Sequence, residues 1–439
     1  MNNLKNRLLL LLALSFATLG ISAQEYNYGD NYRPYPGPSQ TALTPAPKGY
    51  SPCFLSHFGR HGSRYLIGQK TYDEPVRILK QAQADGALTP YGEELLSKLI
   101  IIAEDVRGRQ EELTPLGHQE HQGIATRIYK NFPNLFYAGA HVEAKSSVVI
   151  RCILSMSEEL QTLKSLEPKL DITCDASHGF MSTINQSNRD MDSIALAKGS
   201  VADSLCTSLR KSQFSPNRVF NSIYKDEAYW QRQIADPYHF IEEYLWQISQ
   251  DIADTELRHT ISLDGLFTKD ELRAILLIRN AKWYVGYGAT PLYNGQMVYR
   301  QRNMLRYLVN EADSILSAQL IPDSKAYHTT ASMRFAHETG LLPSVCFLNL
   351  GGAGKAYTRL EDLDGKWMAS DIFPMGANLQ LVFYRKDKAK DNKDVLVKAM
   401  LNEREVTFDD LKPVTGPYYR WSEVRTFWLE KLSKFTGIK

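Results

Sequence analysis

The sequence has little net charge and few cysteines, and it lacks the signatures of nucleic-acid binding. Its 439 residues carry 51 Lys and Arg against 49 Asp and Glu, a formal net charge of +2 at pH 7. It contains no basic tail, no zinc-type spacing and no interleaved basic and aromatic repeats. These absences argue against nucleic acid as a partner. Attraction for an anionic ligand must therefore come from a local cluster of charge.

The amino terminus has the composition of a secretory signal peptide. Lys5 and Arg7 precede an apolar stretch, and small residues ending at Ala23 form a candidate cleavage site. The apolar stretch is shorter than the roughly 20 residues needed to cross a bilayer, which favours a signal peptide over a membrane-spanning helix. No membrane span is expected once the signal peptide is removed. We predict a signal peptide over 1–23 and a periplasmic or secreted protein. Loss of the two cations takes the net charge from +2 to 0.

Disulfides are compatible with export but are not determined by the sequence. An oxidising compartment leads us to expect one or two of them. The odd number of cysteines leaves at least one thiol unpaired. The five candidates are Cys53, Cys152, Cys174, Cys206 and Cys346.

The length of the chain predicts two domains, because a chain this long exceeds what one hydrophobic core usually holds. Residues 24–45 are rich in proline, glycine and tyrosine and are expected to form an irregular lead-in over the surface. Residues 166–319 have a mostly helical pattern between segments with strand patterns. We predict an α/β fold with a central, mostly parallel sheet flanked by helices. It would comprise 46–165 plus 320–439, with 166–319 as an inserted, mainly helical domain.

Two helix starts can be located from their caps. Thr89 and Thr114 each precede a proline at the head of a helical pattern. Threonine is a favoured N-cap, and proline is favoured in the first helical position. We expect helices to begin at both sites.

The segment LSHFGRHGSRYL, residues 55–66, places one histidine, His61, between two arginines directly after a run typical of a strand. The glycine between them lets the backbone approach a ligand, and the guanidinium groups of Arg60 and Arg64 suit phosphate oxygens. The neutral imidazole of His61 is a competent nucleophile near neutral pH. Arg-His-Gly alone is compatible with an exposed turn. The second arginine and the preceding strand favour a phosphate site.

The sequence RHGSR, residues 60–64, resembles the signature of the histidine acid phosphatases. This branch of the histidine phosphatase superfamily includes phytases and multiple inositol polyphosphate phosphatases. SSVVIRC at 146–152 resembles the family's second phosphate-binding arginine segment, and RFAHETGLLP at 334–343 resembles its distal histidine and acid segment. ANLQLVFYR and VLVKAMLNE, near the carboxyl terminus, resemble the closing strands of the inositol polyphosphate branch in particular.

The resemblance implies roles for six side chains. His61 would be the nucleophile that forms a phosphohistidine. Glu338 would protonate the leaving oxygen and later take a proton from water. Four side chains would bind the phosphoryl oxygens: Arg60, Arg64, Arg151 and His337. No metal and no cofactor is implied, because the arginines supply the positive charge.

The distal segment departs from the inositol polyphosphate branch in its spacing. That branch usually reads His-Ala-Glu-Thr, whereas His337 and Glu338 are adjacent here. Adjacent histidine and aspartate are typical of the acid phosphatase and bacterial phytase branch. Tyr65, which follows the second arginine, is closer to the inositol polyphosphate branch. The spacing leaves open where the carboxylate sits and which ring phosphate is attacked.

We predict an exported phosphomonoesterase that hydrolyses inositol polyphosphates such as phytate through a phosphohistidine. The near alternative is a broad-specificity histidine acid phosphatase acting on sugar phosphates. Export and the long helical insertion argue against a transferase similar to phosphoglycerate mutase. A non-catalytic phosphate-binding protein would lack the nucleophile or the acid. The expected partner is a small-molecule phosphate ester, and the sequence does not determine the oligomeric state.

A polyanionic substrate calls for basic side chains beyond the six. The sequence does not show which of them face the site. The available ones include Lys145, Arg210, Lys211, Lys225, Arg279 and Lys282.

Overall fold

The computed structural model describes residues 28–40, 42–195 and 197–438. The predicted signal peptide lies outside these residues. Within them, no helix combines the length and apolarity that crossing a membrane requires.

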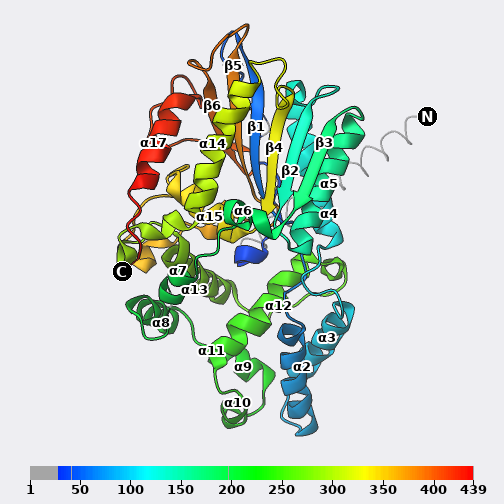
Figure 1. The fold of residues 1–439 in the computed structure, drawn as a ribbon. Coiled ribbons are helices and arrows are strands. Elements are labelled where there is room, and N and C mark those ends of the chain that lie inside the picture. Colours follow the sequence, from blue (N-terminus) through cyan, green and yellow to red (C-terminus); the bar gives the residue numbers. More distant parts are fainter. Residues whose placement is uncertain (1–27, 41, 196, 439) are drawn as a thin grey trace, which may run out of the picture.

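A mixed β-sheet forms the centre of the upper half of the molecule (Figure 1). Its strand order is β3-β2-β4-β1-β5-β6-β7, and β8 pairs with β6. The strands are β1 (Tyr50–Arg60), β2 (His141–Ser146), β3 (Asp171–Ala176), β4 (Thr329–Ala336), β5 (Asn378–Lys386), β6 (Leu396–Leu401), β7 (Arg404–Val406) and β8 (Tyr419–Arg420). The pairs that join β3, β2, β4 and β1 are parallel, and those from β1 through β5 to β8 are antiparallel. The predicted α/β class is confirmed.

Helices cover both faces of this sheet because side chains alternate along each strand. Phe54 and Phe58 of β1 belong to one apolar cluster, and Leu55 belongs to another on the opposite face. The first cluster includes residues of α8 (Val201–Gln213), α13 (Lys269–Tyr287), α14 (Arg302–Ala318), α15 (Glu338–Phe347), α16 (Ala369–Ile372) and α17 (Trp421–Ser433). The second includes residues of α4 (Pro115–Asn131) and α5 (Ile150–Leu166).

A second group of helices lies beyond the lower edge of the sheet in Figure 1 and has its own apolar core. We call it the helical lobe. It comprises α2 (Gln69–Ala84), α3 (Pro90–Asp105), α9 (Asn217–Ile223), α10 (Glu227–Gln233), α11 (Pro237–Phe240), α12 (Trp246–Asp251) and part of α13. Two short helices, α6 (Met181–Ile184) and α7 (Arg189–Ala195), lie between the sheet and α8 along the chain. Helices α2 and α3 lie in the predicted α/β segment 46–165 but pack in the helical lobe. Strand β3 lies in the predicted insertion 166–319 but pairs within the sheet. The division into domains stays a prediction.

The lead-in does not lie wholly over the surface. The 3-10 helix η2 (Asp30–Tyr32) is buried between the sheet and the helical lobe. Asp30 Oδ2 accepts hydrogen bonds from Arg279 Nε and Trp283 Nε1, both at 2.9 Å. The surface expectation is therefore wrong for this part, because a buried ion pair holds the segment inside.

The expectation of disulfides is also wrong. All five cysteines lie in the described part of the chain, and each is a free thiol. Cys152 lies on α5 and Cys206 on α8, helices that belong to different apolar clusters. Packing of the separate elements, rather than pairing, buries these thiols.

Both predicted N-caps are confirmed, and the one at Thr114 is buried. Thr114 Oγ1 accepts from the Gly117 backbone N–H at 3.2 Å and donates to the Ser63 carbonyl at 3.1 Å.

Thr114→Ala should therefore lower the free energy of unfolding by about 1–2 kcal/mol in urea denaturation. The control is Thr126→Ala on the same helix, whose hydroxyl bonds to the Gln122 carbonyl within that helix. This control should change stability by less than about 0.5 kcal/mol, and equal losses would contradict the capping role.

Candidate active site

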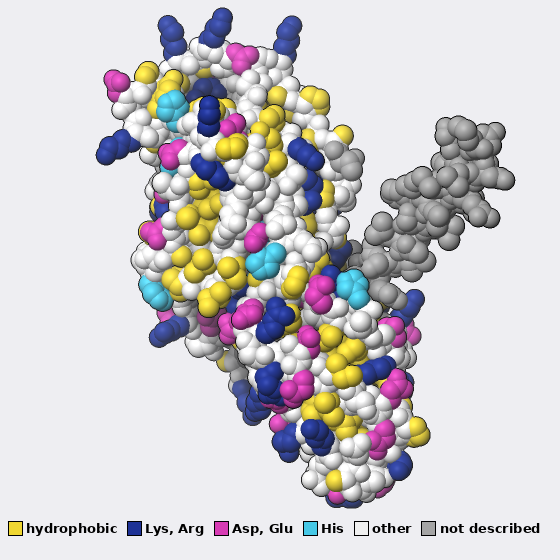
Figure 2. Space-filling model, turned by 90° about the vertical axis from the view of Figure 1, so that its right-hand side faces the viewer, with side chains coloured by type: hydrophobic (Ala, Val, Ile, Leu, Met, Phe, Trp, Pro, Cys, Tyr) yellow, Lys and Arg dark blue, Asp and Glu magenta, His cyan; other side chains and the backbone are white. Residues whose placement is uncertain are grey.

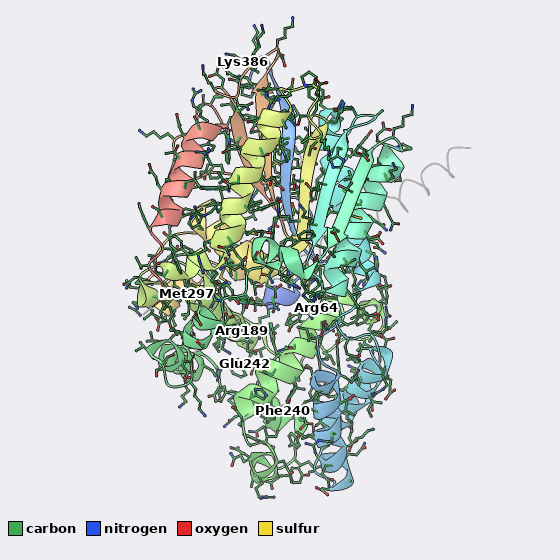
Figure 3. The ribbon with its side chains drawn as sticks, viewed as in Figure 1. Arg64, Arg189, Phe240, Glu242, Met297 and Lys386 are labelled. Carbon is green, nitrogen blue, oxygen red and sulfur yellow. The ribbon has the colours of Figure 1, made fainter. Side chains whose placement is uncertain are left out.

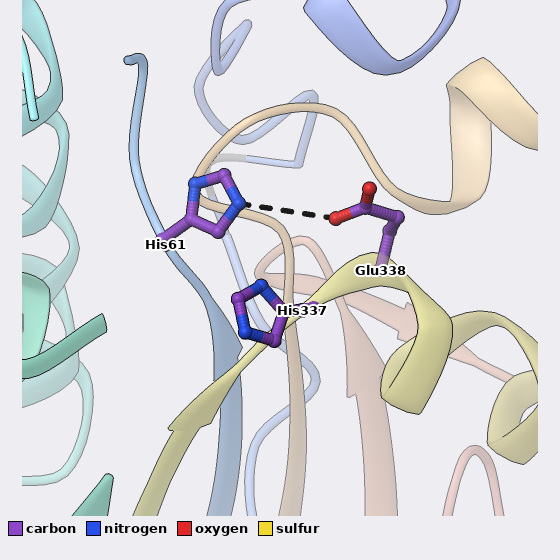
Figure 4. Close-up of side chains that lie close together, drawn as sticks. All are labelled: His61, His337 and Glu338. Atoms are coloured by element: carbon purple, nitrogen blue, oxygen red, sulfur yellow. Dashed lines mark ion pairs between the residues drawn. The ribbon is translucent and has the colours of Figure 1, made fainter. Parts of the chain in front are cut away.

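The sheet brings the two histidine segments together. Strands β1 and β4 are parallel neighbours in register, with Arg60 opposite Ala336. The chain leaves both strands at the same edge, so His61 and His337 emerge side by side (Figure 4). The His61 backbone N–H donates to the Ala336 carbonyl at 3.1 Å, which holds the two exits together. This edge is where α/β sheets commonly bind ligands.

His61 is fixed in the tautomer that a nucleophile needs. Its Nδ1 lies 2.9 Å from the Gly62 carbonyl oxygen, which can only accept, so Nδ1 carries the proton. The lone pair is then on Nε2, 3.9 Å from Glu338 Oε2. Burial lowers the pKa of His61 well below its ordinary value. Four neighbouring side chains that can carry positive charge add to this effect: Arg60, Arg151, His337 and Arg64.

Glu338 is ionised in the ligand-free protein. Burial favours its neutral acid, but the charges of Arg60, His337 and Arg64 outweigh burial and lower its pKa to about 2. Arg60 Nε lies 3.0 Å from Glu338 Oε2. The site therefore holds an anionic acid group beside a neutral imidazole.

Arg60 is held in place by backbone carbonyls. Its Nη1 donates to the Phe373 carbonyl at 2.5 Å, and its Nη2 donates to the Asn31 carbonyl at 2.8 Å. Asn31 belongs to the buried lead-in. This guanidinium is therefore positioned by segments from both ends of the described chain.

His337 faces His61 edge-on, with ring centroids 5.5 Å apart. Its Nε2 lies 3.5 Å from Ser147 Oγ, in the segment between β2 and α5. Burial lowers its pKa to about 4, and the charge of Glu338 opposes this shift. His337 is therefore neutral at pH values well above 4.

Arg64 and Arg151 lie within electrostatic range of His61 and lower its pKa. Arg64 is buried, with its guanidinium 5.4 Å from the centroid of the Tyr32 ring. Arg151 lies in the first turn of α5 and forms an ion pair with Glu111, with 3.0 Å between Nη1 and Oε2. The fold thus brings all six predicted residues to one region, although Arg151 is paired to an acid.

Gly62 allows the loop after His61 to approach α4 closely. A Cβ atom at this position would lie 2.6 Å from the Gly117 carbonyl oxygen. The reverse contact is tighter, since a Cβ at Gly117 would lie 2.2 Å from the Ser63 carbonyl oxygen. Both distances are below any real van der Waals contact, so the loop and helix fit only as two glycines.

The charge of the site favours an anion over a metal cation. Ligand atoms of His61, His337 and Glu338 lie within 4.8 Å of one another, a spacing that could suit a metal ion. Three arginines surround these atoms, however, and their charges act on the same groups. A cation would be repelled by that field, whereas the guanidinium groups match phosphate oxygens.

Several of the other basic side chains are engaged with acids. Arg210 and Lys282 both form ion pairs with Glu242, which lies between α11 and α12. Glu242 is labelled in Figure 3. Arg279 pairs with Asp30. On the face shown in Figure 2, Lys and Arg side chains are intermixed with Asp and Glu rather than gathered in one basic patch. Three of the six additional basic side chains named from the sequence are therefore partly neutralised by acids.

The sequence analysis missed the residues that hold the site in place. Asn31 and Phe373 act through backbone carbonyls, which carry no sequence signal. Glu111 precedes its partner Arg151 by 40 positions. These contacts join segments far apart along the chain, so only the folded structure brings them together.

Three solved structures share the fold. The multiple inositol polyphosphate phosphatase of Bifidobacterium longum, in complex with inositol hexasulfate, aligns with a TM-score of 0.76 and 19% identity over 91% of this chain and 97% of that chain. The phytase from D. castellii aligns with a TM-score of 0.67 and 13% identity over 93% of this chain and 86% of that chain. The Hafnia alvei phytase in complex with myo-inositol hexakis sulphate aligns with a TM-score of 0.55 and 11% identity over 90% of this chain and 100% of that chain.

No protein-family model matches the chain, and no curated protein is found as a relative. The resemblance drawn from the sequence motifs is thus confirmed at the level of the fold. The chain has the fold of these phosphatases.

Proposed function

We propose that this protein is an exported phosphomonoesterase that hydrolyses inositol polyphosphates through a phosphohistidine at His61. The observation that carries the proposal is a neutral, buried imidazole whose Nε2 is unprotonated and faces Glu338 at 3.9 Å. Arginine charge surrounds this nitrogen. Such a group can attack phosphorus while the guanidinium groups stabilise the equatorial oxygens.

The first step transfers the phosphoryl group to the protein. The Nε2 lone pair of His61 forms the bond to phosphorus as the bond to the ester oxygen breaks. Glu338 gives its proton to that oxygen. Because Glu338 is ionised in the free protein, the proton must arrive with the substrate, whose phosphate group has a second pKa of about 6. The negative charge of the bound phosphate then raises the pKa of Glu338 and keeps it protonated.

The second step releases phosphate. A water molecule attacks the phosphorus of the phosphohistidine, and the carboxylate of Glu338 takes one of its protons. The bond between phosphorus and Nε2 breaks, and its electron pair returns to His61. The imidazole is again neutral and ready for the next substrate.

Inositol polyphosphates are proposed as the substrate class on two grounds. β5 and β6 contain the segments that resemble the closing strands of the inositol polyphosphate branch. Two proteins with the same fold were solved with inositol hexasulfate or myo-inositol hexakis sulphate. Both ligands belong to those proteins, and both are polyanionic rings.

The first test is removal of the nucleophile. His61→Ala should lower phosphate release from phytate by more than about a thousandfold, because no group remains to accept the phosphoryl group. Wild-type release should be unaffected by chelator and should yield lower inositol phosphates faster than it cleaves a simple sugar phosphate. His118→Ala, a partly exposed histidine paired with Glu158, is the control and should keep wild-type rates. Wild-type activity in His61→Ala would contradict the proposed mechanism.

The second test separates the acid from the nucleophile. Glu338→Gln should slow hydrolysis of phytate by about a hundredfold to ten thousandfold, since the alkoxide then leaves without a proton. The same variant should lose far less with p-nitrophenyl phosphate, whose leaving group needs no protonation. The measurement is the ratio of kcat/KM for the two substrates. Equal losses on both would show that Glu338 is not the proton donor.

The third test concerns the ion pair at the rim. Glu111 occupies Arg151 in the ligand-free protein, so Glu111→Gln should free the guanidinium and tighten binding of inorganic phosphate. The gain should be at most about fivefold in Kd, since half-exposed ion pairs contribute roughly 1 kcal/mol or less. Isothermal titration calorimetry would measure it. The control is Glu112→Gln, whose acid lies near Arg109 instead, and weaker phosphate binding in Glu111→Gln would contradict the proposed role of Arg151.

A further inference from the structure

Ser63, between His61 and Arg64, lies at the centre of a buried group of carboxyls. Its Oγ is 2.9 Å from Glu120 Oε1 on α4 and 2.9 Å from Asp254 Oδ1. Asp254 ends the 3-10 helix η6 (Ile252–Asp254), which directly follows α12 of the helical lobe. All three side chains are buried. The loop that carries the nucleophile is thus linked to the lobe through one hydroxyl.

The number of protons in this triad is set by its geometry. A serine hydroxyl has one proton to donate, and an ionised carboxylate can only accept. Ser63 can therefore donate to one of its two partners only. The other must itself be protonated and donate to Ser63 Oγ, because two carboxylate oxygens and a hydroxyl cannot form two hydrogen bonds with one proton. One of the two carboxyls holds an extra proton.

The hydrogen bonds identify Asp254 as the protonated partner. Burial raises the pKa of Glu120 as well, but Glu120 accepts the backbone N–H groups of Tyr35 and Ser63, both at 2.7 Å, and these bonds favour its carboxylate. Asp254 Oδ2 is buried without a hydrogen-bond partner, which is far less costly for a neutral acid than for an ion. Burial also raises the pKa of Asp254 well above its ordinary value, and Asp251 and Glu120 raise it further.

The charged and titratable groups around Asp254 come from every element packed against it. Arg64 lies on the loop side and favours its ionised form. Asp251 on α12 and Glu120 on α4 oppose ionisation. Tyr72 on α2 donates to Asp251 at 2.5 Å, and Arg60 also lies within electrostatic range of Asp254. Two arginines thus lie near three acids, and Arg60 is also paired with Glu338, so three negative charges there are unfavourable.

We propose that Asp254 is a positioning residue, which acts as a neutral carboxylic acid to hold Ser63 and, through it, the loop that carries His61 and Arg64. The proposal rests on the proposed phosphatase function for its effect on turnover, but not for the state of the acid. Loss of the proton leaves Ser63 with two acceptors and one proton. The resulting repulsion between Asp254 and Glu120 loosens the loop from the helical lobe.

The variants separate this role from simple packing. Asp254→Asn keeps the shape and replaces the O–H donor by an amide N–H donor, so it should hold Ser63 at any pH. Asp254→Ala removes the donor, so the Ser63 hydroxyl keeps only Glu120 as a partner and the link to the helical lobe is lost. Asp251→Asn is the matched control, because Asp251 lies in the same cluster but bonds to Tyr72 rather than to Ser63.

Two measurements on the whole protein need no substrate. Burial raises the pKa of Asp251 to about 7, so the spectra are recorded at pH 8, where Asp251 is ionised. Infrared difference spectra should then show the carbonyl stretch of a protonated carboxylic acid in the wild type that is missing in Asp254→Asn and remains in Asp251→Asn. Hydrogen exchange of a peptide spanning 60–66 should report the Gly62 and Ser63 amides, which bond to Ser155 Oγ and Glu120. Their protection should fall roughly tenfold to a hundredfold in Asp254→Ala and stay at the wild-type level in Asp254→Asn.

The activity assay then tests the effect on the site. With phytate in mildly acidic buffer, Asp254→Ala should lose roughly tenfold to a hundredfold in kcat/KM, and Asp254→Asn should restore it. A missing acid band in the wild type, or equal loop exchange in the Asn and Ala variants, would overturn the proposal. So would full activity of Asp254→Ala. If the wild type cleaves no phosphate ester, the proposed function fails, while the band and the exchange still decide the role of Asp254.

Discussion

The parallel pairing of β1 with β4 is the constraint on which the rest of the structure depends. Parallel strands in register end at the same edge of a sheet, and here the residues after both ends are the candidate catalytic residues. A slip of one residue would turn the apolar side chains of β1 away from the clusters that bury them. The packing of both faces therefore also sets the distance between His61 and Glu338. Stability and site geometry come from the same contacts.

Burial decides how the charges of the site behave. It drives His61 and His337 toward their neutral forms, while nearby arginines keep Glu338 ionised. The result is a cluster of arginine charge only partly neutralised by one carboxylate. In the proposed mechanism, a phosphate group would supply the missing negative charge and raise the pKa of Glu338 as it binds. Substrate binding would then also activate the acid.

The site is held from three directions. The lead-in fixes Arg60 through the Asn31 carbonyl, α4 fixes the loop through Glu120, and the helical lobe reaches it through Asp254. The helical lobe is therefore connected by a direct hydrogen bond to the loop that follows His61.

The sequence by itself determined the strand before His61, the two closing strands and the two capped helices, because periodicity and caps depend on neighbouring residues. The RHGSR, SSVVIRC and RFAHETGLLP segments also supplied the six candidate site residues. It also determined the α/β class and the family resemblance that the fold then matched. Tertiary structure alone decided that Asp30 is buried, that the cysteines stay unpaired and that α2 and α3 join the lobe. It also decided that Glu338 is ionised and that Ser63 lies between two acids. These properties depend on distances between groups far apart along the chain, which no local pattern encodes.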